Sequence, residues 1–414
     1  MQLSAQTNCD KKERGRSLFP LIKWSVATQS TPLRIPELDG LRGIAVTLVV
    51  VSHYAFIGPS PGDHPVGAER LYLWFQRFFA IGWSGVDMFF VLSGFLIGGI
   101  LLDARDSPTY YKTFYLRRFY RILPLYYLWV FGYLFVMFTS HSWFSALLKV
   151  PSQAPPDPSV FWLFAFVQNV KFTSYVNLGW AWLSPTWSLA VEEQFYLIAP
   201  LLIRRLTRRA LFVVLCAVAV AAPFVRMWAR SHLLSQPVAL DQVYTLLPCR
   251  ADALALGVLT ALLWRSASFR KWLSRNTITL QILGTVFLCG VIGLGYWSPN
   301  NFSLPMESVG YTWLAIFYAL VLLLVLEKPS GAVGSFTRLK WLRKLGGVSY
   351  CIYLIHYAAG WIFRSLLETL VKNPSVWEWT AFCFVGAIVV YLFARASWRD
   401  IESPLLRRAH AYQF

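Results

Sequence analysis

Ionisable side chains inside long apolar runs are the residues of this 414-residue chain that are best suited to do chemistry. His53, Asp87 and Glu192 each lie in such a run, about two turns or less from its expected outer end. A charge at the centre of a bilayer costs roughly 2.5–3.5 kcal/mol on insertion scales, so each of these residues needs a reason to be there. Because a neutral imidazole accepts protons near neutral pH, the three residues predict an acid–base centre that is accessible from outside.

Arg42 and His53 belong to the same run, eleven positions apart. At about 100° per residue, this spacing returns to within about 20° of the same helix face, with His53 about 16 Å beyond Arg42. One face of the first span is therefore expected to carry a cation near its cytoplasmic end and an imidazole deeper inside. Asp87 could instead have a structural role, since a buried ion pair with Arg250 would fix helix packing without taking part in catalysis.

A basic cluster precedes the third apolar run. It consists of Arg117, Arg118 and Arg121, of which the first and last share a helix face at a spacing of four residues. Guanidinium groups bind phosphate through paired hydrogen bonds, so the cluster suits a phosphorylated ligand. The alternative is that these arginines only set the orientation of the chain in the membrane.

The elements that must position these residues are transmembrane helices. The chain is 57% hydrophobic and only 14% charged, whereas a soluble domain carries about 25% charged residues. We expect an all-α integral membrane protein with a bundle of about ten spans of roughly 20 residues. These spans are expected at 41–57, 80–102, 122–140, 187–203, 210–228, 245–264, 277–297, 309–327, 346–370 and 377–398. The apolar stretch at 160–170 is too short to cross and is expected to be external, either re-entrant or interfacial.

The basic residues give the expected orientation of the bundle. With these spans, 27 Lys and Arg lie in the gaps on the side of the N-terminus and 6 lie in the opposite gaps. The positive-inside rule then predicts cytoplasmic termini and a multi-pass protein of the cytoplasmic membrane. The same distribution accounts for the net charge of +18 without a nucleic-acid partner. Six scattered cysteines without a Cys/His cluster predict no metal site.

Three segments are expected along the chain. Residues 1–35 form a basic cytoplasmic extension that has no secretory signal, is interrupted by prolines and is expected to be poorly ordered. Residues 36–404 form the membrane domain, and residues 405–414 form a short cytoplasmic tail. The long external gap at 141–186 is rich in Pro, Trp and Phe, which suit either an interfacial belt or a platform for a sugar ring.

Several motifs in this sequence resemble, in order, those of acyltransferase family 3, the multi-pass membrane O-acyltransferases. The four most specific are 36–45 (PELDGLRGIA), 85–97 (GVDMFFVLSGFLI), 117–126 (RRFYRILPLY) and 187–196 (WSLAVEEQFY). Looser matches follow at 250–257, 349–356 and 402–404. The resemblance thus extends from residue 36 to about residue 404. An additional extracytoplasmic esterase-like domain, which some members carry, is not expected in this chain.

The resemblance implies an O-acetylase of the polysaccharide or lipopolysaccharide type. Such an enzyme transfers an acyl group, usually acetyl from acetyl-CoA, to a hydroxyl of an extracytoplasmic carbohydrate or lipid-linked glycan. By the same carry-over, His53 and Arg42 correspond to the essential residues of the first span and Glu192 to the acid of the fourth motif. The cluster of Arg117, Arg118 and Arg121 falls where the family handles the phosphates of CoA.

The mechanism expected from these residues is general-base catalysis by His53, oriented by Asp87 or Glu192. Direct transfer and an acyl-histidine intermediate are both open. Arg250 and His356 are candidates for stabilising the oxyanion or contacting the acceptor. Gly94 and Gly98 are expected either to let helices approach closely or to leave a narrow channel for the pantetheine arm of CoA; these alternatives stay open.

A carrier is the competing class, because a proton-coupled transporter or a glycolipid flippase also needs membrane-buried His, Asp and Glu. The arginine cluster favours the enzyme, since a flippase does not need to bind CoA phosphates.

Overall fold

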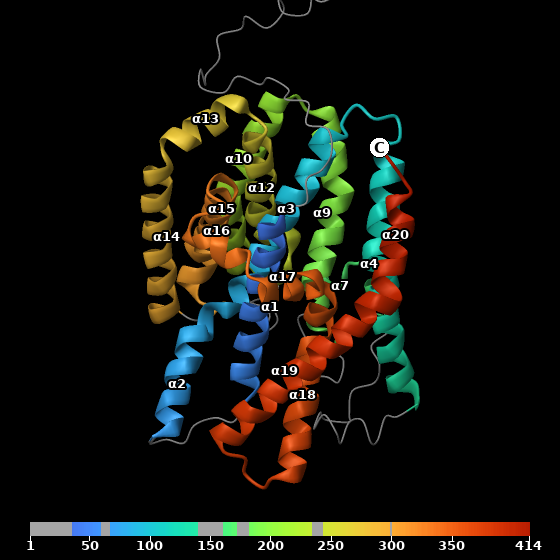
Figure 1. Ribbon diagram of the computed structural model, residues 1–414, viewed down its shortest axis with the longest axis vertical. Helices are drawn as coiled ribbons and strands as arrows, with labels where there is room; N and C mark the ends of the chain where they lie inside the picture. The colour runs from blue at the N-terminus through green and yellow to red at the C-terminus, as the bar shows by residue number, and fades with distance from the viewer. Residues whose placement is uncertain (1–34, 59–66, 140–159, 172–181, 234–242, 299) are drawn as a thin grey trace, which may run out of the picture.

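A computed structural model describes the chain except for residues 1–34, 59–66, 140–159, 172–181, 234–242 and 299 (Figure 1). Within the described residues the secondary structure is helical, without strands. This agrees with the predicted fold class. The expected N-terminal extension at 1–35 and much of the aromatic gap at 141–186 lie outside the described residues.

Among the described residues, ten long helices form the bundle, and each overlaps one of the ten expected spans. They are α1 (Pro36–Ile57), α3 (Gly85–Asp103), α4 (Tyr110–Thr139), α9 (Thr186–Arg205), α10 (Arg208–Leu233), α12 (Leu247–Trp264), α14 (Thr277–Trp297), α15 (Tyr311–Glu327), α18 (Ser349–Leu370) and α19 (Val376–Ser397). In the part of the chain that is described, eight helical stretches are long and apolar enough to cross a membrane. The protein is therefore a multi-pass helical membrane protein.

The helices α9 and α18 are long enough to span but are not among the eight apolar stretches. In α9 the run Glu192-Glu193-Gln194 lowers the mean hydropathy, and in α18 His356 and Arg364 do the same. Both helices carry candidate site residues, and these polar side chains are the reason that hydropathy supports eight spans where ten were expected.

Three helices, α2 (Ala68–Phe79), α4 and α20 (Ser403–His410), differ from the sequence-based map. The helix α2 occupies part of the expected external gap before the second span. The helix α4 begins at Tyr110, twelve residues before the expected third span, so the arginine cluster lies inside the helix rather than ahead of it. The expected tail at 405–414 is largely helical, since α20 covers Ser403–His410. The apolar stretch at 160–170 forms only two short helices, α6 (Val160–Phe164) and α7 (Gln168–Lys171).

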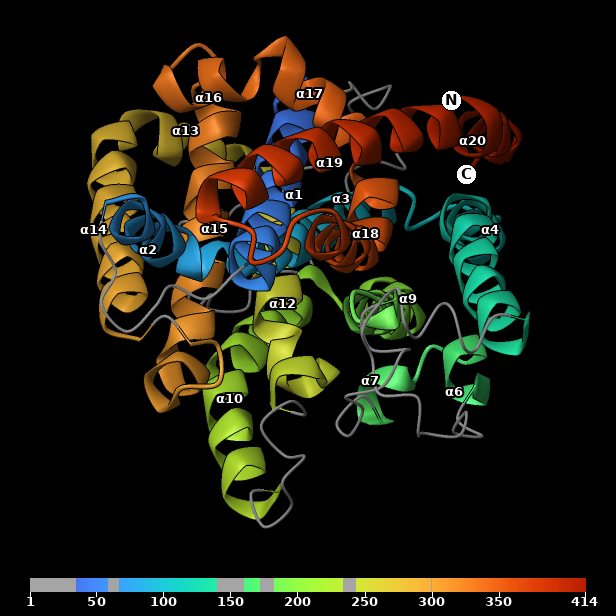
Figure 2. The ribbon, with the colours of Figure 1, turned by 90° about the horizontal axis from the view of Figure 1, so that it is seen from below.

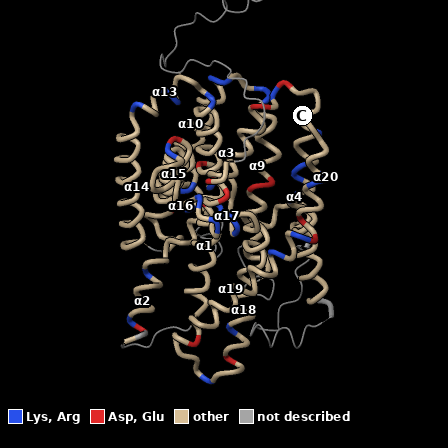
Figure 3. The backbone as a smooth tube through the Cα atoms, in the orientation of Figure 1, with Lys and Arg blue, Asp and Glu red and all other residues tan. Residues whose placement is uncertain are grey.

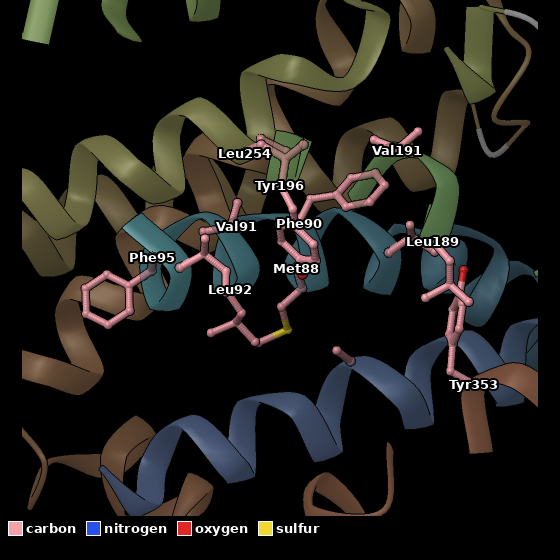
Figure 4. Close-up of a cluster of buried hydrophobic side chains, with 14 of the residues drawn as sticks. Met88, Phe90, Val91, Leu92, Phe95, Leu189, Val191, Tyr196, Leu254 and Tyr353 are labelled. Carbon is pink, nitrogen blue, oxygen red and sulfur yellow. The ribbon is translucent and has the colours of Figure 1, made fainter. Parts of the chain in front are cut away.

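The centre of the bundle is α3, which packs against α1, α9, α12 and α15. Its apolar side chains, with those of α9 and α12, form the buried cluster in Figure 4. A Cβ on Gly94 would lie 2.2 Å from the carbonyl oxygen of Leu254, and one on Gly257 would lie 2.2 Å from that of Val91. Gly94 therefore serves close helix approach, one of the two alternatives expected for it. A Cβ on Gly98 would likewise meet the side chain of Val258 at 3.0 Å.

The N-terminal half of α1 packs against two short helices, α16 (Ala332–Thr337) and α17 (Lys340–Gly347), which lie beside α1 in Figure 2. A Cβ on Gly43 would lie 2.2 Å from the carbonyl oxygen of Leu342, so only glycine allows this contact. Glu37, which is buried, pairs with Arg338 from the turn between the two short helices. The amino-terminal half of α1 is thereby fixed.

The C-terminal end of α1 is fixed by side chains of other helices. Helix carbonyls in the last turn lack intrahelical partners and must be satisfied in other ways, above all inside a membrane. Four side chains donate hydrogen bonds of 2.6–3.1 Å to the carbonyls of residues 54, 55 and 57, namely Trp379, Tyr72, Gln76 and Arg364. They come from α19, α2 and α18, so three helices hold the turn that follows His53.

Candidate active site

A cavity of about 650 Å³ opens beside the C-terminal half of α1. Its walls combine aromatic rings with uncharged polar side chains. The aromatic wall residues include Trp83, Trp187, Tyr244, Phe302, Tyr353 and Tyr357. The polar wall residues include Ser52, Gln76, Ser184, Thr245, Asn300 and Asn301, and Arg77 is also in the wall. Most of these residues were not singled out from the sequence, because they come from segments that are far apart in the chain.

His53 lies in the wall of this cavity and is half-buried. Its Nδ1 atom is 2.9 Å from Nε2 of His356 on α18, and Nδ1 of His356 is 2.7 Å from the carbonyl oxygen of Tyr353. The ring of Tyr357 meets the His53 ring edge-on at 4.9 Å. His356 is completely buried and is not among the residues that line the cavity. Two candidate site residues from different helices, His53 and His356, thus form one pair.

Asp87 and Arg250 form a buried ion pair between α3 and α12, with 2.7 Å between Oδ1 and Nη2. The guanidinium lies 4.2 Å from the ring centroid of Tyr311 and 5.0 Å from that of Tyr244, which adds cation–π attraction. This is the ion pair that the sequence left open as the structural alternative for Asp87. Neither residue lines the cavity as described, although Tyr244 connects the pair to its wall.

A second buried ion pair lies further along α12. Arg226 donates to Asp252 at 2.9 Å, and Asp252 also accepts a hydrogen bond of 2.6 Å from Thr312. Glu307, also buried, pairs with Arg230. These residues connect α10, α12 and α15. The ion pairs and hydrogen bonds named here connect different helical elements, which is typical of a structural network.

Glu192 lies in a different group of charged residues. Figure 3 shows that acidic and basic positions occur inside the bundle as well as at its ends. Glu192 accepts hydrogen bonds from Ser93 at 2.6 Å and Tyr196 at 3.1 Å, and it interacts electrostatically with Arg42 and Arg118. We call Arg42, Arg118, Arg121, Glu192 and Glu193 the inner cluster, because electrostatic interactions connect them. The expected contact of His53 with Asp87 or Glu192 is not what the structure has, since the partner of His53 is His356.

The three arginines of α4 do not act as one group. Arg118 belongs to the inner cluster, where its guanidinium lies 6.0 Å from the ring of Tyr196 and its Nε atom has no hydrogen-bond partner among the described residues. Arg117 instead donates to the carbonyl oxygen of Tyr412 at 2.9 and 2.6 Å and lies over the ring of Phe414. The C-terminal residues therefore occupy the guanidinium of Arg117.

Several of the predicted site residues meet, in three places. His53 and His356 lie at the cavity, Asp87 and Arg250 lie behind its aromatic wall, and Arg42, Arg118, Arg121 and Glu192 lie in the inner cluster. Arg117 lies apart from all three. The described residues contain no group of three or more His, Cys, Asp or Glu that could hold a metal ion.

Comparisons with known proteins bear on this arrangement. The peptidoglycan O-acetyltransferase OatA of Listeria monocytogenes is 26% identical over 389 residues, covering 92% of this chain and 57% of that protein. The O-acetyltransferase OatA of Staphylococcus aureus is 25% identical over 403 residues, covering 91% of this chain and 58% of that protein. The Bacillus subtilis protein YrhL is 28% identical over 386 residues, covering 90% and 55%. The chain thus spans somewhat more than half the length of these curated relatives.

No solved structure gives a significant match to the chain. A family model described as an acyltransferase domain matches residues 35–395, which is most of the sequence and includes both histidines, the Asp87–Arg250 pair and the inner cluster. The chain therefore belongs to acyltransferase family 3.

Proposed function

We propose that this protein is a membrane O-acyltransferase that moves an acetyl group from cytoplasmic acetyl-CoA to a hydroxyl of an extracytoplasmic cell-wall glycan. The observation that carries the proposal is His53 in the wall of an aromatic, polar cavity. Family membership supports acyl transfer. The names of two relatives, which specify O-acetyl transfer and in one case peptidoglycan, support the choice of acyl group and acceptor.

The lining of the cavity suits a sugar. Aromatic rings such as Trp83 and Trp187 offer flat apolar faces to the C–H face of a pyranose ring. The amides of Asn300 and Asn301 offer both donors and acceptors to sugar hydroxyls. This combination of apolar area with a few polar groups is typical of small-ligand sites.

The proposed reaction is one proton transfer coupled to acyl transfer. Nε2 of His53 removes the proton of the acceptor hydroxyl as its oxygen attacks the thioester carbonyl of acetyl-CoA. The new C–O bond forms, the C–S bond breaks, and the imidazolium returns its proton to the departing thiolate. The products are the acetyl ester and CoA, so atoms and charge balance. Preventing water from entering the cavity would favour transfer over hydrolysis.

The inner cluster is the proposed site for the phosphate end of CoA. Arg118 and Arg121 have the chemistry for bidentate phosphate contacts, and the unpartnered Nε of Arg118 supports a ligand there. Arg42, which belongs to the inner cluster, lies eleven residues before His53 on α1, about 16 Å along the helix. The pantetheine arm would bridge this distance. Arg117 would contribute only if the C-terminal residues released it.

Sided acyl transfer in proteoliposomes tests the proposal. Protein of known orientation should acetylate an external peptidoglycan fragment when radiolabelled acetyl-CoA is supplied on the cytoplasmic side, with free CoA remaining where it was added. His53→Ala should reduce turnover at least about 100-fold, the scale of general-base catalysis. His410→Ala, at an exposed histidine on α20, is the control and should leave turnover unchanged.

Two results would contradict the proposal. If intact glycan or CoA crossed the bilayer without ester formation, the protein would be a carrier. If His53→Ala inserted normally and kept full turnover, His53 would not be the base.

A further inference from the structure

We propose that His356 is a positioning residue that holds His53 in the tautomer with a proton on Nδ1 and a bare Nε2 available to the cavity. The inference rests on the proposed function in one respect, that His53 acts as the base. Its structural content is a chain of two hydrogen bonds that runs from the backbone of α18 to α1.

The first link fixes the proton of His356. Its Nδ1 lies 2.7 Å from the carbonyl oxygen of Tyr353. A carbonyl oxygen only accepts hydrogen bonds, so Nδ1 of His356 must carry a proton. His356 is completely buried in the bundle, where a lone charge would be costly, so its ring is neutral. Its Nε2 atom is therefore bare.

The second hydrogen bond fixes the proton of His53 in the same way. Nδ1 of His53 lies 2.9 Å from the bare Nε2 of His356. Two bare nitrogens at that distance would repel each other, so Nδ1 of His53 must be the donor. In the neutral ring the remaining nitrogen, Nε2, then has the free lone pair. His53 lines the cavity, whereas His356 does not. Because Nδ1 of His53 faces His356, the lone pair on Nε2 is the one available to a substrate in the cavity.

The two hydrogen bonds have the same function as the carboxylate in a serine hydrolase triad, although the groups are different. A hydrogen bond to one ring nitrogen of a histidine selects which nitrogen acts on the substrate. Here the acceptor is a neutral imidazole whose own tautomer is set by a backbone carbonyl. When Nε2 of His53 takes up the substrate proton, the Nδ1–H bond to His356 strengthens, which stabilises the imidazolium.

The surroundings hold both rings in place. The ring of Tyr357 lies edge-on to both, 4.9 Å from His53 and 6.3 Å from His356. The hydroxyl of Tyr353 pairs with Ser188 of α9 at 2.7 Å, so the residue that supplies the carbonyl is itself tied to a neighbouring helix. An oxyanion-binding or acceptor-contacting role for His356, as considered from the sequence, would require access to the cavity. Its complete burial favours the positioning role.

The tautomers can be measured directly on the whole protein. With ¹⁵N-labelled histidine in lipid nanodiscs, NMR distinguishes protonated from bare ring nitrogens, and His53→Gln and His356→Gln identify the signals by their loss. We expect Nδ1 protonated and Nε2 bare for both residues. A protonated Nε2 and a bare Nδ1 on His53 would overturn the proposal, whether or not the protein shows acyl transfer.

Kinetics of two substitutions test the consequence. His356→Leu removes the acceptor, and we expect kcat to fall by about 100-fold or more while the KM of the glycan changes less than about threefold. His356→Gln keeps an acceptor oxygen near the position of Nε2 and a donor for the carbonyl, so it should recover kcat to within about tenfold of the parent protein.

Other results would separate the possibilities. Equal kcat for the Leu and Gln variants would mean that His356 only fills space. A raised KM at unchanged kcat would mean that it contacts the glycan. Either outcome overturns the positioning role. If His356→Leu fails to fold, the NMR measurement on the parent protein decides. The expected tautomers without any acyl transfer would refute the proposed function while supporting the hydrogen-bond chain.

Discussion

The Asp87–Arg250 pair joins α3 and α12, and both side chains are almost completely buried. Removing one member of a buried pair leaves an uncompensated charge, which typically costs about 3–5 kcal/mol. We expect Asp87→Leu to lower the melting temperature of the purified protein strongly. Asp87→Leu combined with Arg250→Met should recover most of the loss, since no unpaired charge remains. Thermal unfolding in one detergent would compare both variants with the parent.

Activity of the double variant then separates structure from chemistry. Because the described cavity does not include Asp87, we expect acyl transfer to return together with stability. A stable double variant without turnover would assign Asp87 to the chemistry instead.

Donor binding at the inner cluster gives a second prediction for individual residues. Substituting Arg118 and Arg121 by Gln should weaken acetyl-CoA binding at least about tenfold, because bidentate phosphate contacts are worth more than screened surface charge. The same change at Arg208 and Arg209, at the start of α10, is the matched control and should have little effect. Titration of purified protein with acetyl-CoA measures both. Equal losses for the two pairs would indicate general electrostatic attraction in place of a site.

The sequence identified ionisable residues inside the bundle but did not predict which residues they contact. His53 and His356 were both singled out by charge inside apolar runs, but 303 positions separate them, and helix periodicity relates only residues on one helix. Asp87 and Glu192 were expected at the depth of His53 because depth follows from position along a span. Helix packing decides which helix faces meet. In this bundle Asp87 accepts a hydrogen bond from Arg250, and Glu192 accepts one from Ser93.

Among the helices, hydropathy located the bundle but misjudged elements with mixed character. The start of α4 at Tyr110 was not predicted because Lys112 and the arginines interrupt the apolar run. Long basic side chains are nevertheless compatible with such a helix, because their charged ends can extend to polar groups. The helix α2 was missed because it is amphipathic: Trp74 and Phe78 are exposed, while Gln76 faces the cavity. Amphipathic helices give a weak signal in a test designed for uniformly apolar spans.

The crossing of α3 and α12 gives a prediction for the pair of helices. Gly257→Ala should destabilise the protein by about 1–3 kcal/mol, the usual cost of overpacking, because its Cβ would lie 2.2 Å from a backbone oxygen that cannot rotate away. Gly132→Ala in α4 is the control, since its Cβ would lie 3.7 Å from the ring of Trp182. The difference in melting temperature between the two variants measures the effect. Equal melting temperatures would contradict the close crossing.

For the whole molecule, orientation in the membrane is the property that the proposed reaction most depends on. The turn between α18 and α19 and the helix α13 (Ala267–Arg275) lie at opposite ends of the bundle (Figure 1). In a cysteine-free background, Lys372→Cys in that turn should react with an impermeant maleimide on intact cells, whereas Ser274→Cys on α13 should react only after lysis. Both positions are exposed, so accessibility within the protein is matched. The opposite labelling pattern would reverse the orientation and exclude a cytoplasmic donor at the inner cluster.

The four side chains that bind the last carbonyls of α1 have a consequence for how the proposed activity would be lost. The end of a helix is ordinarily the first part to fray, and His53 lies about one turn from the C-terminal end of α1. Donors from α2, α18 and α19 prevent that fraying. Loss of the indole of Trp379, 325 positions from the carbonyl of Tyr54 that it binds, should therefore raise amide hydrogen exchange in the last turn of α1. The geometry of His53, the proposed base, is in this sense maintained by the whole bundle, so that damage to a distant helix would cause local unfolding around His53.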